Sequence, residues 1–149
     1  MLNALQNSDP AFVDTNIFVY AEDRREPIKR GIALSLIERL SKENRLVVSP
    51  QVINEFCAVL FRGKVRTATQ EDMLALIEEM EAIAIVAPLT LELTRDAIRA
   101  SYSCSISWYD ALIWAAAKSS NCTIIYTEDT PGVQVFEGVR YINPFQPHS

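Results

Sequence analysis

One stretch near the amino terminus decides the fold: the apolar run Ala11-Phe12-Val13, followed at once by Asp14-Thr15-Asn16. Three consecutive apolar residues predict a short buried strand. The three residues after it favour helix caps and turns, because their side chains bond to nearby backbone groups. The sequence therefore predicts a strand that ends on a carboxylate, with a helical stretch to follow.

The rest of the chain alternates short apolar runs with segments of helical periodicity. Further strands are predicted at residues 46–48, 83–87, 122–126 and 139–142. Helices are predicted at residues 27–41, 50–61, 69–81, 90–100 and 107–119. Short uninterrupted strands between helices favour an α/β fold, in which a parallel sheet is covered by helices on both faces.

The composition narrows the chemistry open to the chain. Its 149 residues predict one domain, and the 49% apolar and 22% charged residues are typical of a soluble globular protein. A single histidine near the carboxyl terminus and three cysteines outside any CxxC pair argue against histidine-based catalysis, a disulfide framework and a zinc site. No apolar run is long enough to cross a membrane, so a cytoplasmic protein is expected.

Four acidic residues are predicted to converge at the carboxyl ends of the strands, where ligands bind in this class of fold. Asp14 follows the first strand, and Asp129 follows the fourth. Glu55 lies in the first turns of the helix after the second strand, and Asp110 begins the helix that leads into the fourth. Close carboxylates repel unless a cation neutralises them, and oxygen ligands select Mg²⁺ or Mn²⁺. The arrangement predicts such an ion and, with it, phosphodiester hydrolysis.

Each acid also has a purely structural explanation. Asp14 could cap the helix that follows it, and Asp129 could close an Asx-turn before the Pro-Gly pair. Asp110 could belong to a capping box at the start of its helix. Glu55 could be a solvated side chain that pairs with Arg62. The joint placement of the four acids favours a shared site over four separate explanations.

Four segments resemble, in order and spacing, the acidic motifs of the PIN-domain ribonucleases, and above all those of the VapC-type toxins of bacterial toxin–antitoxin modules. The segments are Phe12-Val13-Asp14-Thr15-Asn16, Ile53-Asn54-Glu55-Phe56, Tyr109-Asp110-Ala111-Leu112-Ile113-Trp114-Ala115-Ala116-Ala117 and Tyr126-Thr127-Glu128-Asp129. The resemblance covers roughly residues 12–145.

The resemblance implies a single PIN-like domain whose parallel sheet, in strand order 3-2-1-4-5, is sandwiched between helices. It implies Mg²⁺ or Mn²⁺ at the pocket, cleavage of RNA, a homodimer and a cognate antitoxin protein. By motif match, the catalytic and metal-binding acids are Asp14, Glu55, Asp110 and Asp129, with Asn16 and Thr127 as supporting polar groups. The domain is expected over residues 11–145, after a leader at 1–10 and before a tail at 146–149.

The net charge of −5 is unusual for a protein that binds RNA, but setting aside the four pocket acids leaves −1. Two basic groups are predicted to hold phosphates beside the pocket, namely Arg24, Arg25, Lys29 and Arg30, and Arg62, Lys64 and Arg66. Solvated helix faces explain either group equally well.

Two other functions stay open at this point. A phosphohydrolase with Asp14 as its nucleophile would be expected to carry a second acid two residues later, where this chain has Asn16. A catalytically inactive PIN-like binding module would keep the acidic pocket without affinity for a metal.

Overall fold

The computed structural model describes residues 8–131 and 135–147. Its six-stranded sheet has the order β3-β2-β1-β4-β6-β5. The strands are β1 (Ala11–Val13), β2 (Leu46–Val48), β3 (Ile85–Val86), β4 (Ile124–Tyr126), β5 (Val135–Phe136) and β6 (Val139–Ile142). All neighbouring strands are parallel except β5, which pairs antiparallel with β6.

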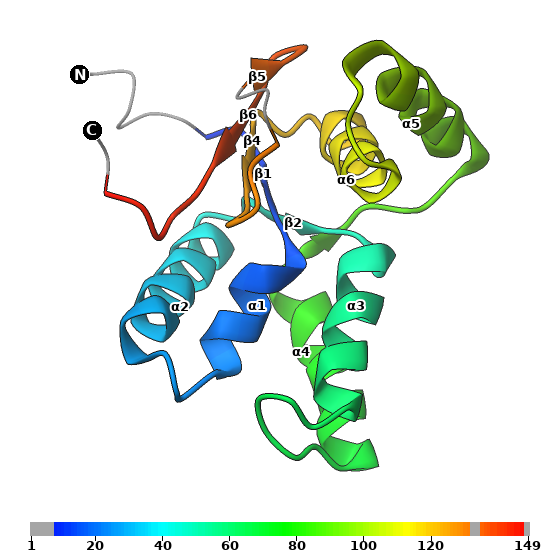
Figure 1. The fold of residues 1–149 in the computed structure, drawn as a ribbon. Coiled ribbons are helices and arrows are strands. Elements are labelled where there is room, and N and C mark those ends of the chain that lie inside the picture. Colours follow the sequence, from blue (N-terminus) through cyan, green and yellow to red (C-terminus); the bar gives the residue numbers. More distant parts are fainter. Residues whose placement is uncertain (1–7, 132–134, 148–149) are drawn as a thin grey trace.

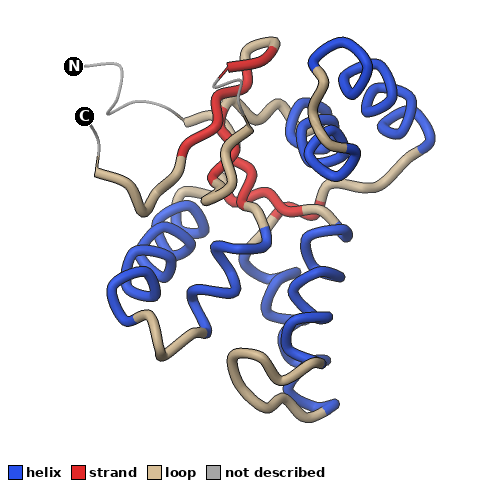
Figure 2. The backbone as a smooth tube through the Cα atoms, in the orientation of Figure 1, coloured by secondary structure: helices blue, strands red, loops and turns tan. Residues whose placement is uncertain are grey.

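The helices form two layers around this sheet (Figures 1 and 2). They are α1 (Thr15–Glu22), α2 (Pro27–Lys42), α3 (Pro50–Phe61), α4 (Gln70–Ile83), α5 (Leu91–Cys104) and α6 (Trp108–Ser119). The chain moves outward from β1 to β3 and then returns to β4 on the other side of β1. Right-handed crossovers therefore place α1 to α4 on one face, and α5 and α6 on the other.

The predicted strand order 3-2-1-4-5 is confirmed, with β6 as the fifth predicted strand. The prediction was wrong in one respect: it lacked β5, so the sheet is not parallel throughout. Glu137 and Gly138, with φ of 44° and 82°, form the two-residue connection between β5 and β6. Positive φ at both positions is what a tight type I′ hairpin requires.

Several element boundaries also differ from the prediction. The apolar run at 83–87 is divided, because Ile83 completes α4 and β3 keeps two residues. The run at 122–126 is shortened because the Cys122 amide bonds to the Ala117 carbonyl and so continues the end of α6. The predicted start of α4 is confirmed, since Thr69 and Asp72 form a reciprocal capping box. Gly63, predicted to end α3, has a φ of +66° directly after its cap residue.

The core lies between β1 and its flanking helices. All three residues of β1 are 0% exposed. The apolar segment of α6 is buried on almost its whole circumference, as its sequence predicts. The site is therefore built at the end of a rigid central strand.

The predicted division into leader, domain and tail stays a prediction. Residues 1–7 of the leader and 148–149 of the tail lie outside the described residues. Residues 9 and 10 at the end of the leader do contact the domain, since the Asp9 carbonyl accepts a hydrogen bond from Arg45 at 2.7 Å and the Pro10 carbonyl accepts one from Thr123 at 3.3 Å. Within the described part of the chain, no helix is long and apolar enough to span a bilayer.

Candidate functional site

The candidate site begins where β1 and β4 end side by side. Their register pairs Val13 with Tyr126, so the residues that follow, Asp14 and Thr127, are neighbours. The Asp14 amide continues the ladder with a 3.0 Å bond to the Tyr126 carbonyl. The sheet order reverses at this pair of strands, and such a switch point is where parallel sheets leave a crevice for ligands.

The Asp14 carboxylate is held from two sides. Oδ1 accepts a 2.7 Å bond from the Thr15 amide, and Oδ2 accepts a 2.8 Å bond from the Thr127 hydroxyl. Asp14 is also the N-cap of α1, as its structural explanation expects. A carboxylate has about four lone-pair sites, so two bonds leave it the capacity to bind another group.

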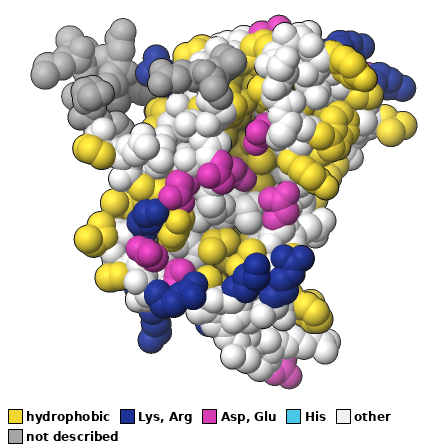
Figure 3. Space-filling model, viewed as in Figure 1, with side chains coloured by type: hydrophobic (Ala, Val, Ile, Leu, Met, Phe, Trp, Pro, Cys, Tyr) yellow, Lys and Arg dark blue, Asp and Glu magenta, His cyan; other side chains and the backbone are white. Residues whose placement is uncertain are grey.

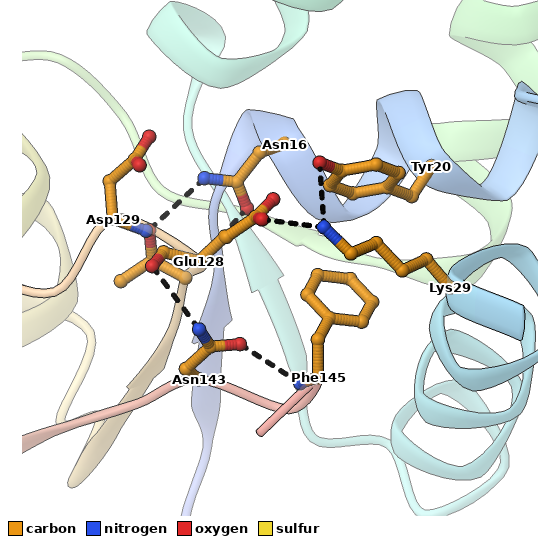
Figure 4. A network of polar contacts seen from close by, with 8 residues as sticks. Asn16, Tyr20, Lys29, Glu128, Asp129, Asn143 and Phe145 are labelled. Carbon is orange, nitrogen blue, oxygen red and sulfur yellow. Dashed lines mark hydrogen bonds and ion pairs between the residues drawn. The ribbon is translucent and has the colours of Figure 1, made fainter. Parts of the chain in front are cut away.

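The Thr127 hydroxyl connects most of the polar groups at this edge. The residue is 2% exposed, and its oxygen donates to Asp14 while accepting bonds from Asn16 Nδ2 at 3.2 Å and the Asp129 amide at 3.1 Å. Asn16 Oδ1 in turn accepts a 3.2 Å bond from the Glu128 amide (Figure 4). Asn16 is therefore bonded to Thr127, and Thr127 to Asp14, while the supporting role predicted for both residues stays a prediction.

Glu55 is oriented by two neighbours that the sequence analysis did not identify. Its Oε2 accepts a 2.8 Å bond from the Thr15 hydroxyl, and its Oε1 accepts a 3.1 Å bond from Gln51. The alternative in which Glu55 pairs with Arg62 is wrong, since none of the ion pairs between described residues joins them. Thr15 thus contacts both Asp14 and Glu55 and links the end of β1 to α3.

The electrostatics place two other acids within range of the Asp14 charge. Burial is the largest cause that raises the pKa of Asp14, and the charges of Glu55 and Asp110 raise it further, against the lowering effect of the bonds from Thr127 and Thr15. Asp129 is an exposed residue at the same edge, where its amide bonds to the Thr127 hydroxyl.

Asp110 and Asp129 have carboxylates that are free to bind a ligand. At the start of α6, the Ser107 hydroxyl accepts a 3.2 Å bond from the Asp110 amide, which is half of the expected capping box. Neither carboxylate accepts a hydrogen bond from another described residue. The Asx-turn predicted for Asp129 before Pro131-Gly132 stays a prediction, because Pro131 has no amide hydrogen and Gly132 lies outside the described residues.

The donor chemistry of the site fits a hard divalent cation. The acids offer only oxygen ligands, and a buried tyrosine hydroxyl nearby, that of Tyr141, has no hydrogen-bond partner among the described residues. Burial, followed by the charges of Asp110, Cys104 and Asp14, raises the pKa of Tyr141 to about 12. In the described part of the chain, however, no three acidic, histidine or cysteine side chains are placed to enclose an ion. The all-oxygen chemistry of the acids, and not an enclosing set of ligands, is what suits a hard ion that keeps several of its waters, as Mg²⁺ does.

The predicted phosphate contacts fall into three classes. Lys29, Arg25 and Arg66 are each engaged by an acid, Glu128, Asp23 and Glu22 respectively, at 2.7 to 2.8 Å. Arg24, Arg62 and Lys64 are exposed and form no ion pair with a described residue. Arg30 is half-buried, and its Nε has no partner in that same part of the chain. Figure 3 shows Lys and Arg side chains along the lower border of a face that carries many Asp and Glu side chains.

A groove of about 430 Å³ lies beside Glu55, between α3 and the helices on the other face of the sheet. Leu89, Leu93 and Leu112 supply its apolar lining. The rings of Trp108 and Tyr109 also line it and are 41% and 65% exposed. Exposed aromatic rings can stack on unpaired bases.

The sequence reasoning missed Thr15, Gln51 and Tyr141. Gln51 stands four residues before Glu55 on one helix, which is a spacing that places two side chains together and could have revealed it. Thr15 is adjacent to Asp14, but its bond to Glu55 spans 40 residues. No local pattern predicts that contact.

Comparison with protein families gives one match, to the family described as the PIN domain, over residues 11–131. The search of curated proteins found no significant match.

Three solved structures share the fold at low sequence identity. VapBC2 from Rickettsia felis, bound to a DNA fragment from its promoter, gives a TM-score of 0.65 and 17% identity over 89% of this chain and 97% of that one. Mycobacterium tuberculosis VapC20, a toxin that cleaves the Sarcin-Ricin loop, gives a TM-score of 0.58 and 19% identity over 87% of this chain and 98% of that one. FitAcB from Neisseria gonorrhoeae gives a TM-score of 0.56 and 17% identity over 92% of this chain and 99% of that one.

We expect Asp14→Asn to raise the free energy of unfolding of the metal-free protein at pH 7. The folded site favours the protonated acid, so the contribution of Asp14 to stability is greatest below its ordinary pKa and is lost as the pH rises through the raised pKa. The difference in free energy of unfolding between the variant and the wild type should therefore decrease as the pH falls. Urea denaturation in the presence of chelator, at several pH values, measures this difference. Asp96→Asn on exposed α5 is the control, with a change within about 0.5 kcal/mol, and a destabilised Asp14→Asn protein at pH 7 would contradict the expectation.

A pair of threonines tests the role of the Thr127 hydroxyl. Thr127→Val removes the hydrogen-bond partner of Asp14 Oδ2, Asn16 Nδ2 and the Asp129 amide, and should lower the free energy of unfolding by about 1–3 kcal/mol. The Thr123 hydroxyl is buried with no partner among the described residues, so Thr123→Val should be neutral or slightly stabilising. Equal decreases in the free energy of unfolding of the two variants, measured by urea denaturation, would rule out a special role for the Thr127 hydroxyl.

Proposed function

Because the chain belongs to the PIN-domain family, we propose that it is a divalent-metal-dependent endoribonuclease and the toxin of a type II toxin–antitoxin module. The observation that carries the proposal is the buried Asp14 carboxylate at the switch point of the sheet, whose pKa is raised first by burial and further by the charges of Glu55 and Asp110. Ionising Asp14 at this position therefore has an energetic cost. A bound cation would reduce that cost.

The residues proposed to hold the ion are Asp14, Glu55, Asp110 and Asp129, and Mg²⁺ or Mn²⁺ suits their all-oxygen chemistry. When bound, such an ion stabilises the charge on a phosphoryl oxygen and lowers the pKa of a water molecule. Asp14 and Asp110 would be the principal ligands. Glu55 would bind directly or through a water molecule, and Asp129 would complete a second site or orient the attacking water.

The neighbouring residues fix these acids before any substrate arrives. Thr15 and Thr127 fix the Asp14 carboxylate, and Thr15 with Gln51 fixes that of Glu55. Preorganised charge of this kind stabilises a transition state without reorganisation during the reaction. Asp129 has no bonded partner for its carboxylate among the described residues and can accept a proton from water at the edge of the site.

The surroundings of the site support RNA as the substrate. Arg24, Arg62 and Lys64 are free within the described residues to meet phosphates, and the groove beside Glu55 offers exposed rings to unpaired bases. The toxin role rests on the fold shared with VapBC2, VapC20 and FitAcB. By the same likeness we propose an antitoxin protein and a second copy of this chain as partners. The three free cysteines agree with action in the reducing cytoplasm.

The proposal predicts cleavage of cellular RNA that needs Mg²⁺ or Mn²⁺ and stops on addition of chelator. Asp14→Asn and Asp110→Asn should each reduce the rate by at least about 100-fold, because even outer-shell partners of a metal contribute about 10–100-fold. Gel analysis of RNA fragments, with circular dichroism to verify folding, measures the effect. Asp96→Asn, an acid paired with Arg99 on exposed α5, should keep full activity.

Three outcomes would contradict the proposal. Cleavage that persists in chelator would remove the metal from the reaction. No cleavage of any RNA, together with no Mn²⁺ affinity, would favour the inactive binding module, and a covalent aspartyl-phosphate at Asp14 would favour the phosphohydrolase.

A further inference from the structure

Lys29 of α2 lies at the centre of contacts that join three distant parts of the chain (Figure 4). Its ammonium donates to Glu128 Oε1 at 2.7 Å and to the Tyr20 hydroxyl at 3.2 Å. The same nitrogen lies 4.5 Å from the centre of the Tyr20 ring and 5.5 Å from that of Phe145. The two rings contact each other edge to face at 5.0 Å. We name Lys29, Tyr20, Glu128 and Phe145 the lysine clamp.

The lysine clamp acts on the loop that carries two residues of the acidic site. Glu128 stands between Thr127, which bonds to Asp14, and Asp129. Its amide donates to Asn16, and its carbonyl accepts a 3.3 Å bond from Asn143. These bonds fix the loop backbone, and the lysine clamp fixes the Glu128 side chain. Of the two acids in this loop, only Asp129 then has a carboxylate without a bonded partner among the described residues.

We propose that Lys29 is a positioning residue of the acidic site, which holds the loop of Thr127 and Asp129 in place through Glu128 and keeps the Glu128 carboxylate out of the cation site. The proposal rests on the proposed function, because it concerns the same site. It also gives a role to the segment after β6, since Phe145 provides one of the two rings beside the ammonium.

The contacts are stronger than those of an ordinary surface ion pair. The Lys29 and Glu128 side chains are 32% and 28% exposed, so water screens them only in part. Two aromatic faces add cation–π attraction. Burial alone raises the pKa of Glu128, but the bonds from Lys29 and Tyr20 outweigh it and lower the pKa, so the acid stays ionised and bound.

This assignment differs from the prediction that Lys29 contacts RNA. The hydrogen bonds of its ammonium are internal, whereas Arg24 of the same basic group and Lys64 of the other are exposed. If Lys29 contacted a phosphate instead, its replacement would weaken RNA binding without any change in metal affinity. The two roles can therefore be separated.

The test is Lys29→Gln in the full chain, with two measurements that need no RNA. Hydrogen exchange at the Glu128 and Asp129 amides, followed by NMR, should become about tenfold faster, because the loop opens more often. Mn²⁺ affinity, measured from the electron paramagnetic resonance signal of free Mn²⁺, should fall about tenfold, at the lower end of the range for outer-shell partners.

The sign of the affinity change excludes a simple charge effect. Removing a positive charge beside acids would by Coulomb's law strengthen Mn²⁺ binding, whereas a loss of positioning weakens it. Lys29→Arg keeps a cation for Glu128 and should restore most of the affinity. Lys42→Gln is the matched control, since Lys42 lies on the same helix and pairs with Glu38 away from the site, and it should change neither quantity.

Each remaining outcome overturns the proposal in an identifiable way. If wild type binds Mn²⁺ and Lys29→Gln binds it equally or more tightly, the metal site stands and the positioning role fails. If amide exchange in the loop is unchanged, the lysine clamp does not hold it. If wild type binds no Mn²⁺, the proposed function itself fails, and the positioning role fails with it.

Discussion

The whole site depends on the parallel register of β1 and β4. Because Val13 pairs with Tyr126, the first residue beyond each strand is placed next to the other, and Asp14 meets the Thr127 hydroxyl at 2.8 Å. All three residues of β1 are buried, so a shift of the register that moved Asp14 into the place of Val13 would put a carboxylate in the core. The strand pair thus fixes the position of Asp14, whose ionised form is disfavoured by burial and by the neighbouring charges.

The energetic cost of ionising Asp14 connects the structure to the proposed function. Burial and the charges of Glu55 and Asp110 act against the ionised form of Asp14, while Thr15 and Thr127 donate hydrogen bonds that favour it. A cation bound beside these acids would relieve the repulsion that raises the pKa of Asp14. In the proposed function, the donors fix the carboxylates and the bound cation would supply the missing positive charge.

Much of this could be predicted from the sequence, because it depends on local pattern. The bounds of β1, β2 and β6 follow from apolar runs, and the positions of Asp14 and Asp129 follow from the ends of strands. The features that sequence reasoning missed depend on contacts distant along the chain. Lys29 reaches Glu128 across 99 residues, and a basic cluster gives no sign that one member is engaged internally. The short strand β5 depends on positive φ at Glu137, a residue that rarely adopts it.

The most direct test of the central claim is anomalous X-ray diffraction from crystals soaked in Mn²⁺. A manganese peak is expected at the edge where β1 ends and α6 begins, within about 2–2.5 Å of carboxylate oxygens of Asp14 and Asp110. A well-ordered pocket with no peak, or manganese bound only to acids elsewhere on the surface, would contradict it.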